Sequence, residues 1–120
     1  MRRSRLSVLA SDIEVLVRAK TRLDRLSLYP RAVSIDRVWI VSAPWLFALP
    51  WFRRFDGYTM WNLILLRSPR LAADEDLVCH ELCHVWQMQH HPIRMPLSYL
   101  RAGYAHNPYE EEARRAASSR

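Results

Sequence analysis

Glycine and cysteine are both scarce in this 120-residue chain, which contains two of each. The two thiols lie four residues apart, which is poor material for a disulfide framework, and an iron–sulfur cluster would normally require four thiolates. Free thiols are typical of a reducing compartment. No Gly/Ser linker, low-complexity tract or internal repeat divides the chain. The length and the lack of a linker predict a single domain over residues 1–120.

Long apolar runs are also missing. The most apolar window, 43–52, contains Pro44 and Pro50 and is too short to span a bilayer. The first residues resemble a secretory signal because basic residues precede an apolar stretch, but Asp12 and Glu14 interrupt that stretch before it reaches signal length. We therefore expect a soluble cytoplasmic protein with no transmembrane segment.

Lysine is represented only by Lys20, whereas arginine is abundant: the chain has 18 basic residues and a formal net charge of +6. Such a surplus favours acidic partners, nucleic acid or an anionic membrane surface. The arginines are scattered from Arg2 to Arg120, which is more typical of a solvated basic surface. Nucleic acid is thus not the favoured partner, although the charge does not exclude it.

The aromatic segment 45–52 is either a contact surface or buried packing, and the oligomeric state is left open.

The periodicity of the first two thirds of the chain predicts one helix and two strands. Half of the residues are hydrophobic, which is enough for a core. Apolar residues at spacings of three, four or seven predict an amphipathic helix over 6–26, ended by Tyr29-Pro30. Ser11 and Glu14 have capping-box spacing, which allows a later start at Ser11. Strands are predicted at 33–41 and 58–66, with a turn at Asp56-Gly57 between them.

The last third of the chain predicts two helices. Three acidic residues at 74–76 favour a helix N-terminus, and the helix can then run without glycine or proline to about His90. Pro92 and Pro96 end it, and a short segment, 97–102, follows. Asn107 as N-cap and Pro108 at the first helical position predict a final helix to about 118. The expected class is α/β (α+β), with an N-terminal helix, a small two- or three-stranded sheet and these two helices.

The string VCHELCHVWQ places two histidines and a glutamate on the predicted helix 74–90. Residues four apart on a helix project from one face, so His80 and His84 can both reach a single ion, at about 2.0–2.1 Å for zinc. Glu81 can lean toward the open coordination position and take a proton from metal-bound water, whose pKa zinc lowers to about 7. The alternative is that the histidines are ordinary core or surface residues and Glu81 a solvated charge.

A catalytic zinc site needs a third protein ligand, and several side chains compete for this role. His90 lies where metzincins place a third histidine, but the glycine that bends the chain in that motif is missing, and on a continued helix His90 faces away. His91 lies too far along the axis and suits the rim of a cleft. Glu110 or Glu112 could supply a carboxylate from the last helix, although Glu110 also has capping-box spacing to Asn107.

HELCHVWQ followed by NPYEEEA resembles the small gluzincin-type zinc metallopeptidase domains, in which HExxH precedes an NP-aromatic-ExEA helix. The pair is similar, less closely, to integral-membrane HExxH proteases whose ExxAD segment gives the glutamate ligand. Residues 110–113, EEEA, match the ExxA part of that segment, so the resemblance implies that Glu110 is the glutamate ligand. Arg114 stands where the segment has its aspartate. The resemblance covers about residues 76–116. It also implies that the strand at 58–66 forms the upper rim of a cleft, where an exposed strand edge could bind an extended peptide.

The resemblance thus implies a minimal zinc metallopeptidase-like domain that hydrolyses peptide bonds. His80, His84 and Glu110 would bind Zn²⁺, Glu81 would be the catalytic general base, and the partner would be a peptide or protein substrate. One rival hypothesis keeps the metal without catalysis, as a structural or regulatory zinc-binding module. The other is a basic nucleic-acid or membrane-surface binding protein in which the histidines are incidental.

Two further sets of side chains lie near the motif in the sequence. Cys79 and Cys83 each precede a histidine, yet small apolar core residues are the favoured interpretation rather than metal ligands. A developing oxyanion in a zinc hydrolase is often met by a tyrosine or histidine donor besides the metal. Tyr104, His106 and Tyr109, which lie near Glu110 in the sequence, are the candidates for this donor.

Overall fold

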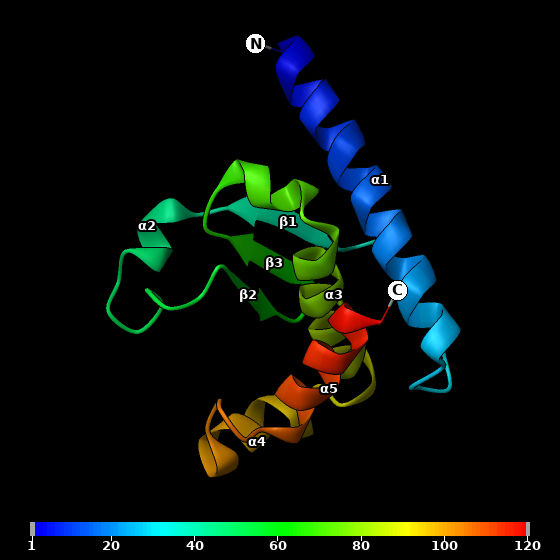
Figure 1. The fold of residues 1–120 in the computed structure, drawn as a ribbon, viewed down its shortest axis with the longest axis vertical. Helices are drawn as coiled ribbons and strands as arrows, with labels where there is room; N and C mark the ends of the chain where they lie inside the picture. Colours follow the sequence, from blue (N-terminus) through cyan, green and yellow to red (C-terminus); the bar gives the residue numbers. More distant parts are fainter. Residues whose placement is uncertain (1, 120) are drawn as a thin grey trace.

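The computed structural model describes residues 2–119, with side chains from Ile13 to Ser119. Within this range the fold is α+β, as predicted, and its sheet has three strands. Figure 1 shows helix α3 beside the sheet, with α1 and α5 next to it. No helix among the described residues is both long and apolar enough to cross a bilayer. The elements are, in chain order, α1 (Arg2–Leu26), β1 (Trp39–Ser42), α2 (Pro44–Phe47), β2 (Gly57–Met60), β3 (Leu63–Leu66), the 3₁₀ helix η1 (Pro69–Ala73), α3 (Glu75–His90), α4 (Arg94–Ala102) and α5 (Pro108–Ser118).

Helix α1 extends over the whole predicted amphipathic stretch and beyond it. It begins at Arg2, so the later start at Ser11 that the capping-box spacing allowed is wrong. It ends at Leu26, because Ser27 adopts a left-handed conformation with φ of 50° before Tyr29-Pro30 is reached.

Strand β1 confirms only the end of the predicted strand at 33–41. Residues 33–38 pair with no described strand, because side chains of α1 form hydrogen bonds with the backbone N–H and carbonyl of Val33 instead. The Val33 N–H donates to the Asp24 carboxylate at 3.1 Å, and Lys20 donates to the Val33 carbonyl at 2.8 Å. The sequence pattern could not reveal this competition, since it depends on how α1 lies against the segment.

The predicted strand at 58–66 is two strands joined by a tight turn, which accounts for the third strand of the sheet. Strand β2 pairs antiparallel with β3, which pairs parallel with β1, so the order is β1-β3-β2. At the turn, Trp61 has φ of 50°, and its N–H donates to the Met88 sulfur of α3 at 3.0 Å. A tryptophan in a left-handed conformation gives no turn signal in the sequence.

Helices α3 and α5 agree with their predicted bounds. Asp74 caps α3 by accepting a hydrogen bond from Leu77 N–H, and Asn107 caps α5 by accepting one from Tyr109 N–H. The segment 97–102 belongs to α4, which includes Pro96 as its third residue. Proline is tolerated there because the first N–H groups of a helix have no intrahelical partner.

Helix α3 is the centre of the hydrophobic core, and α1, β3 and α5 pack around it. Cys79 and Cys83 are fully buried free thiols in this core, as predicted, and burial raises the pKa of Cys79 to about 11. The main contributors to the core are Val15, Leu16, Ala19 and Leu23 of α1, Ile64 and Leu66 of β3, Val78, Leu82, Val85 and Trp86 of α3, and Ala113 and Ala116 of α5.

Arg22 of α1 links the two helices that carry the candidate site. Its guanidinium donates to Glu75 and Asp76 in the first turn of α3, at 3.1 and 2.9 Å. It also donates to the carbonyls of Ala117 and Ser119 at the C-terminal end of α5, at 2.8 and 2.9 Å. One nearly buried cation thus fixes the start of α3 against the end of α5.

Candidate metal centre

Two histidines of α3 and one glutamate of α5 converge on a single point. The Nε2 atom of His80 lies 2.7 Å from Glu110 Oε1, and the Nε2 atom of His84 lies 3.0 Å from Glu110 Oε2. One ligand atom from each of the three residues lies within 4.8 Å of the other two. The structure thus brings together the three side chains that the sequence analysis selected as metal ligands, although Glu110 lies 30 residues after His80 and 26 after His84 in the sequence.

Small side chains between α3 and α5 make this convergence possible. Ala113 and Ala116 of α5 are buried, and the carbonyl of Ala116 lies 3.8 Å from the Cys79 sulfur of α3. Because cysteine and alanine occupy little volume, the two helix backbones approach closely. Glu110, in the first turn of α5, then reaches the face of α3 that carries the histidines. The capping-box role for Glu110 is not adopted, since the Asn107 N–H donates to the Tyr104 carbonyl instead.

The three groups are electrostatically coupled. Glu110 is 1% exposed, and burial alone would favour its neutral form. The hydrogen bonds to His80 and His84 outweigh burial and hold the pKa of the Glu110 carboxyl well below its usual range. Burial likewise disfavours the charged form of His84, but the hydrogen bond to Glu110 and the nearby carboxylates raise the pKa of His84 above its ordinary value. The cluster is therefore an anionic carboxylate between two imidazoles.

Gln87 orients one of the two imidazoles. Its side-chain oxygen accepts a hydrogen bond from Nδ1 of His84 at 2.8 Å, which leaves Nε2 directed at Glu110. The Gln87 amide group donates to the Tyr109 carbonyl at 2.8 Å and to Glu112 Oε1 at 3.0 Å. The sequence analysis assigned Gln87 no role in the site. Its position three residues after His84, on the same face of the helix, was the available signal.

Glu112 lies outside the cluster, so its role as an alternative ligand is wrong. Its carboxylate accepts hydrogen bonds from Tyr29 Oη at 2.6 Å and from Gln87. Burial, followed by these interactions with Glu112, raises the pKa of Tyr29 well above its usual range. Tyr29, Glu112 and Gln87 thus form a hydrogen-bonded chain that ends at His84.

His90 and His91 also lie outside the cluster. The His90 ring stacks on Tyr29 with centroids 4.9 Å apart, and its Nδ1 lies 3.1 Å from the Trp86 carbonyl. His91 packs against the rings of Tyr29 and Tyr109 and does not line the cleft described below. The helical geometry that argued against both residues as ligands is consistent with these positions.

Glu81 is held between α3 and the edge strand β2. The Thr59 hydroxyl lies 2.7 Å from Glu81 Oε1, so it can donate to one oxygen of the carboxylate. Gly57 packs against the same side chain: a Cβ at Gly57 would lie 3.0 Å from both Cγ and Oε2 of Glu81. Both contacts come from β2, and the sequence analysis linked neither residue to Glu81. The turn predicted at Asp56-Gly57 is wrong, because Gly57 is the first residue of β2.

A cleft of about 280 Å³ opens beside the cluster. Glu81, His84 and Glu110 line it, and they are among its few polar groups. Most of its remaining wall is apolar, and comes from the loop before β2, from β2 with its turn, and from α3 and α4. The other lining residues are Phe55, Gly57, Tyr58, Thr59, Met60, Trp61, Met88, Met95, Pro96, Tyr99 and Tyr104.

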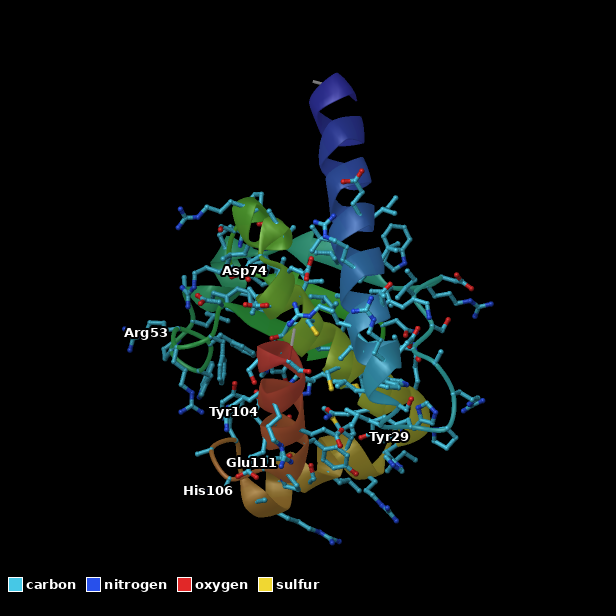
Figure 2. The ribbon with its side chains drawn as sticks, turned by 45° about the vertical axis from the view of Figure 1, so that its right-hand side comes forward. Tyr29, Arg53, Asp74, Tyr104, His106 and Glu111 are labelled. Atoms are coloured by element: carbon cyan, nitrogen blue, oxygen red, sulfur yellow. The ribbon has the colours of Figure 1, made fainter. Side chains whose placement is uncertain are left out.

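Two tyrosines face Glu110 in this cleft. Tyr99 Oη donates to Glu110 Oε2 at 2.9 Å; sequence reasoning missed this residue because nothing local distinguished it. Burial, followed by the charge of Glu110, raises the pKa of Tyr104 well above its usual range, so its phenol stays protonated. His106 is exposed, and Figure 2 shows it and Tyr104 on the side of α5 opposite Tyr29. Neither His106 nor Tyr109 lines the cleft, so of the three predicted oxyanion donors only Tyr104 is in position.

Comparisons with known proteins assign no family to this chain. No family model matches the sequence, and comparisons with curated proteins and with solved structures gave no significant match. The chemistry of the donor set is therefore the basis for interpreting the site. Two imidazoles and a carboxylate, with a free approach from a cleft, form a donor set typical of catalytic zinc sites.

Proposed function

We propose that this protein is a zinc-dependent metallopeptidase. The observation that carries the proposal is the convergence of His80 and His84 of α3 with Glu110 of α5 at the wall of a cleft that also contains Glu81. A structural zinc site is normally closed by four protein ligands, whereas a catalytic site has three and keeps one position open. The cluster offers three ligands among the described residues, which favours the catalytic type.

His80, His84 and Glu110 would hold the ion, and their surroundings suit that role. When bound, zinc would polarise the substrate carbonyl and lower the pKa of the attacking water. The carboxylate of Glu110 is anionic, and the hydrogen bond to Gln87 keeps Nδ1 of His84 protonated so that Nε2 can serve as the ligand atom.

Glu81 would move the proton in the reaction. Its carboxylate would accept a proton from the water whose oxygen attacks the carbonyl carbon, and would then pass that proton to the nitrogen as the C–N bond breaks. The Thr59 hydroxyl and the close contact with Gly57 restrict the orientation of the Glu81 side chain. A positioned general base of this kind typically contributes about 10²–10⁴-fold to the rate.

The walls of the cleft favour a peptide segment with apolar side chains as the substrate. Strand β2 is at the edge of the sheet and lines the cleft, so its free edge can pair with an extended peptide. Met60, Met88 and Met95 contribute flexible apolar surface to the same cleft.

Metal content tests the first part of the proposal. The wild-type chain, purified without added zinc, is expected to contain one zinc per molecule by atomic absorption, and His84→Ala is expected to lose it. His106→Ala is the matched control, because His106 is exposed and belongs neither to the cluster nor to the lining of the cleft. A metal-free wild type that also fails to bind added zinc would refute the proposal.

Glu81→Gln separates an enzyme from a non-catalytic zinc module. The glutamine keeps an oxygen for the Thr59 hydroxyl but cannot accept the proton. The variant is therefore expected to bind zinc normally and to lose at least about 100-fold in peptide hydrolysis, measured with a fluorogenic peptide library. Glu111→Gln, on the exposed side of α5, is expected to retain activity. If Glu81→Gln and wild type are equally inactive while both bind zinc, the non-catalytic module is the better description.

A further inference from the structure

The outer face of the sheet consists entirely of apolar and aromatic side chains. Ile40, Ile64 and Leu66 pack into the core, and Thr59 contacts Glu81 of α3. Because side chains alternate between the two faces of a strand, their neighbours lie on the other face. On the edge strand β2, two of these neighbours, Tyr58 and Met60, also line the cleft. The register places these neighbours in two rows across the three strands, Trp39–Leu63–Met60 and Val41–Leu65–Tyr58.

This outer face is open to solvent. Trp39 is 69% exposed, Val41 42% and Met60 41%, while Leu63 and Leu65 at the centre are half-buried. A sheet with one solvated face normally carries polar residues there. A contiguous apolar face of this kind marks a surface that contacts another apolar phase or molecule.

The segment 44–56, which begins with α2 and is called the aromatic loop below, continues the apolar surface beyond the strands. Phe52 packs against Tyr58 of the outer face with ring centroids 5.1 Å apart. In the same segment Trp45 is 71% exposed and Trp51 76%, whereas Phe47 is buried and anchors α2. Figure 1 shows α2 and this loop projecting from the side of the sheet opposite α1.

The charged residues in the segments that flank this face are mainly basic. Figure 2 shows Arg53 at the outer edge of the aromatic loop. Only two acidic residues, Asp36 and Asp56, lie in the same segments, and Asp56 is paired with Arg67. The basic residues in the loop and before the start of β1 are Arg37, Arg53 and Arg54, whereas Arg67 is already bound to Asp56 and to backbone carbonyls of the loop.

We propose that the outer face of the sheet, together with the aromatic loop, docks on an anionic lipid bilayer. Exposed tryptophan and tyrosine favour the boundary between hydrocarbon and headgroups, and arginine binds anionic headgroups beside them. A second copy of the chain is disfavoured as the occupant, because a two-fold interface would bring identical basic rims together. Strand β2 also lines the cleft, so docking would bring the cleft mouth close to the bilayer.

Vesicle binding tests this proposal independently of the metal site. The wild-type chain is expected to float with vesicles of phosphatidylcholine and phosphatidylserine but not with phosphatidylcholine alone. Raising the ionic strength from about 0.05 M to about 0.5 M is expected to weaken binding about tenfold or more, because it screens the arginines. Brominated lipid in the anionic vesicles is expected to quench the tryptophan fluorescence of the wild type.

Paired variants identify the surface. Trp39→Thr/Val41→Thr is expected to weaken vesicle binding about tenfold or more, because both side chains leave the bilayer. The control Ile13→Thr/Val17→Thr removes comparably exposed apolar side chains of α1 and is expected to bind as the wild type does. Circular dichroism checks that each variant is folded.

Three results would overturn the proposal. The first is a wild type that binds no anionic vesicle at low ionic strength and shows no quenching by brominated lipid. The second is unchanged binding by the folded Trp39→Thr/Val41→Thr variant. The third is a concentration-dependent dimer in light scattering that Val41→Thr abolishes, which would assign the face to a second copy or to another protein.

Discussion

Gln87 is fully buried three residues after His84, and it is the only group that the structure places against Nδ1 of that imidazole among the described residues. Metal-bound histidines depend on such partners, because the partner fixes both the tautomer and the orientation of the ring. Gln87 is itself held by Tyr109 and Glu112, so its side chain has little freedom. At the scale of single residues, the candidate site therefore extends beyond its three ligands to an amide that the motif does not include.

Gln87→Met tests this positioning role. The variant keeps the volume of the side chain but leaves the Nδ1–H group of His84 without an acceptor, so zinc affinity is expected to fall about 10–100-fold. Competition with a chromophoric chelator measures the affinity. Gln89→Met, on the same helix, is the control. Within the part of the chain that the structure describes, the Gln89 side chain bonds to the backbone of Ser34, and its loss is expected to leave zinc affinity unchanged. Equal affinities of the two variants would contradict the role of Gln87.

At the scale of elements, the position of α5 against α3 decides whether Glu110 reaches the histidines. Ala113 and Ala116 set the distance between the helices, and Arg22 ties the far end of α5 to the start of α3. Arg22 is close to buried, and its partners are carboxylates at a helix N-terminus and carbonyls at a helix C-terminus. A cation stabilises both kinds of group, because the carboxylates are negatively charged and the last carbonyls of a helix have no intrahelical donor.

Arg22→Ala is expected to destabilise the fold by about 2–4 kcal/mol, because it leaves carboxylates and carbonyls without their donor. For a chain of this size the midpoint of thermal unfolding would fall by roughly 10 °C. Arg18→Ala is the comparison: Arg18 also bonds to Glu75, but its side chain is 55% exposed, so a change below about 1 kcal/mol is expected. Thermal unfolding followed by circular dichroism measures both, and similar losses would show that Arg22 has no special role.

At the scale of the whole molecule, a bound ion would join α3 to α5 and so contribute to global stability. Metal-free protein keeps the two helices together at this point through the contacts of Glu110 with His80 and His84. Because the pKa of His84 is raised, the contact of His84 contributes fully to the free energy of unfolding below pH 6.5, the pKa of an unperturbed histidine. This contribution is lost as the pH rises through the pKa that His84 has in the folded state. Because the pKa of Glu110 is lowered, its carboxylate contributes fully to the free energy of unfolding above pH 4.5, the pKa of an unperturbed glutamate. This contribution is lost only in strong acid.

Zinc is therefore expected to raise the unfolding midpoint more at about pH 8 than at about pH 6. At the higher pH the ion competes with fewer protons, and the metal-free protein has lost part of its own His84–Glu110 contact. At a free zinc concentration about 100 times the Kd, the stabilisation is about 2.7 kcal/mol. The measurement is thermal unfolding with zinc or with a chelator at both pH values. A shift of the same size in His84→Ala would mean that zinc binds elsewhere.

The sequence by itself determined what depends on neighbours along the chain. The bounds of α3 and α5, their caps at Asp74 and Asn107, and the common face of His80 and His84 all follow from helical periodicity and short-range hydrogen bonding. Only the tertiary structure decided what depends on contacts between distant segments. It selected Glu110 over Glu112 and His90, made the segment 58–66 into a hairpin through Trp61 and Met88, and placed Thr59 and Gly57 against Glu81. Such choices depend on which side chains of a neighbouring element fill the space, and periodicity along the chain carries no information about that packing.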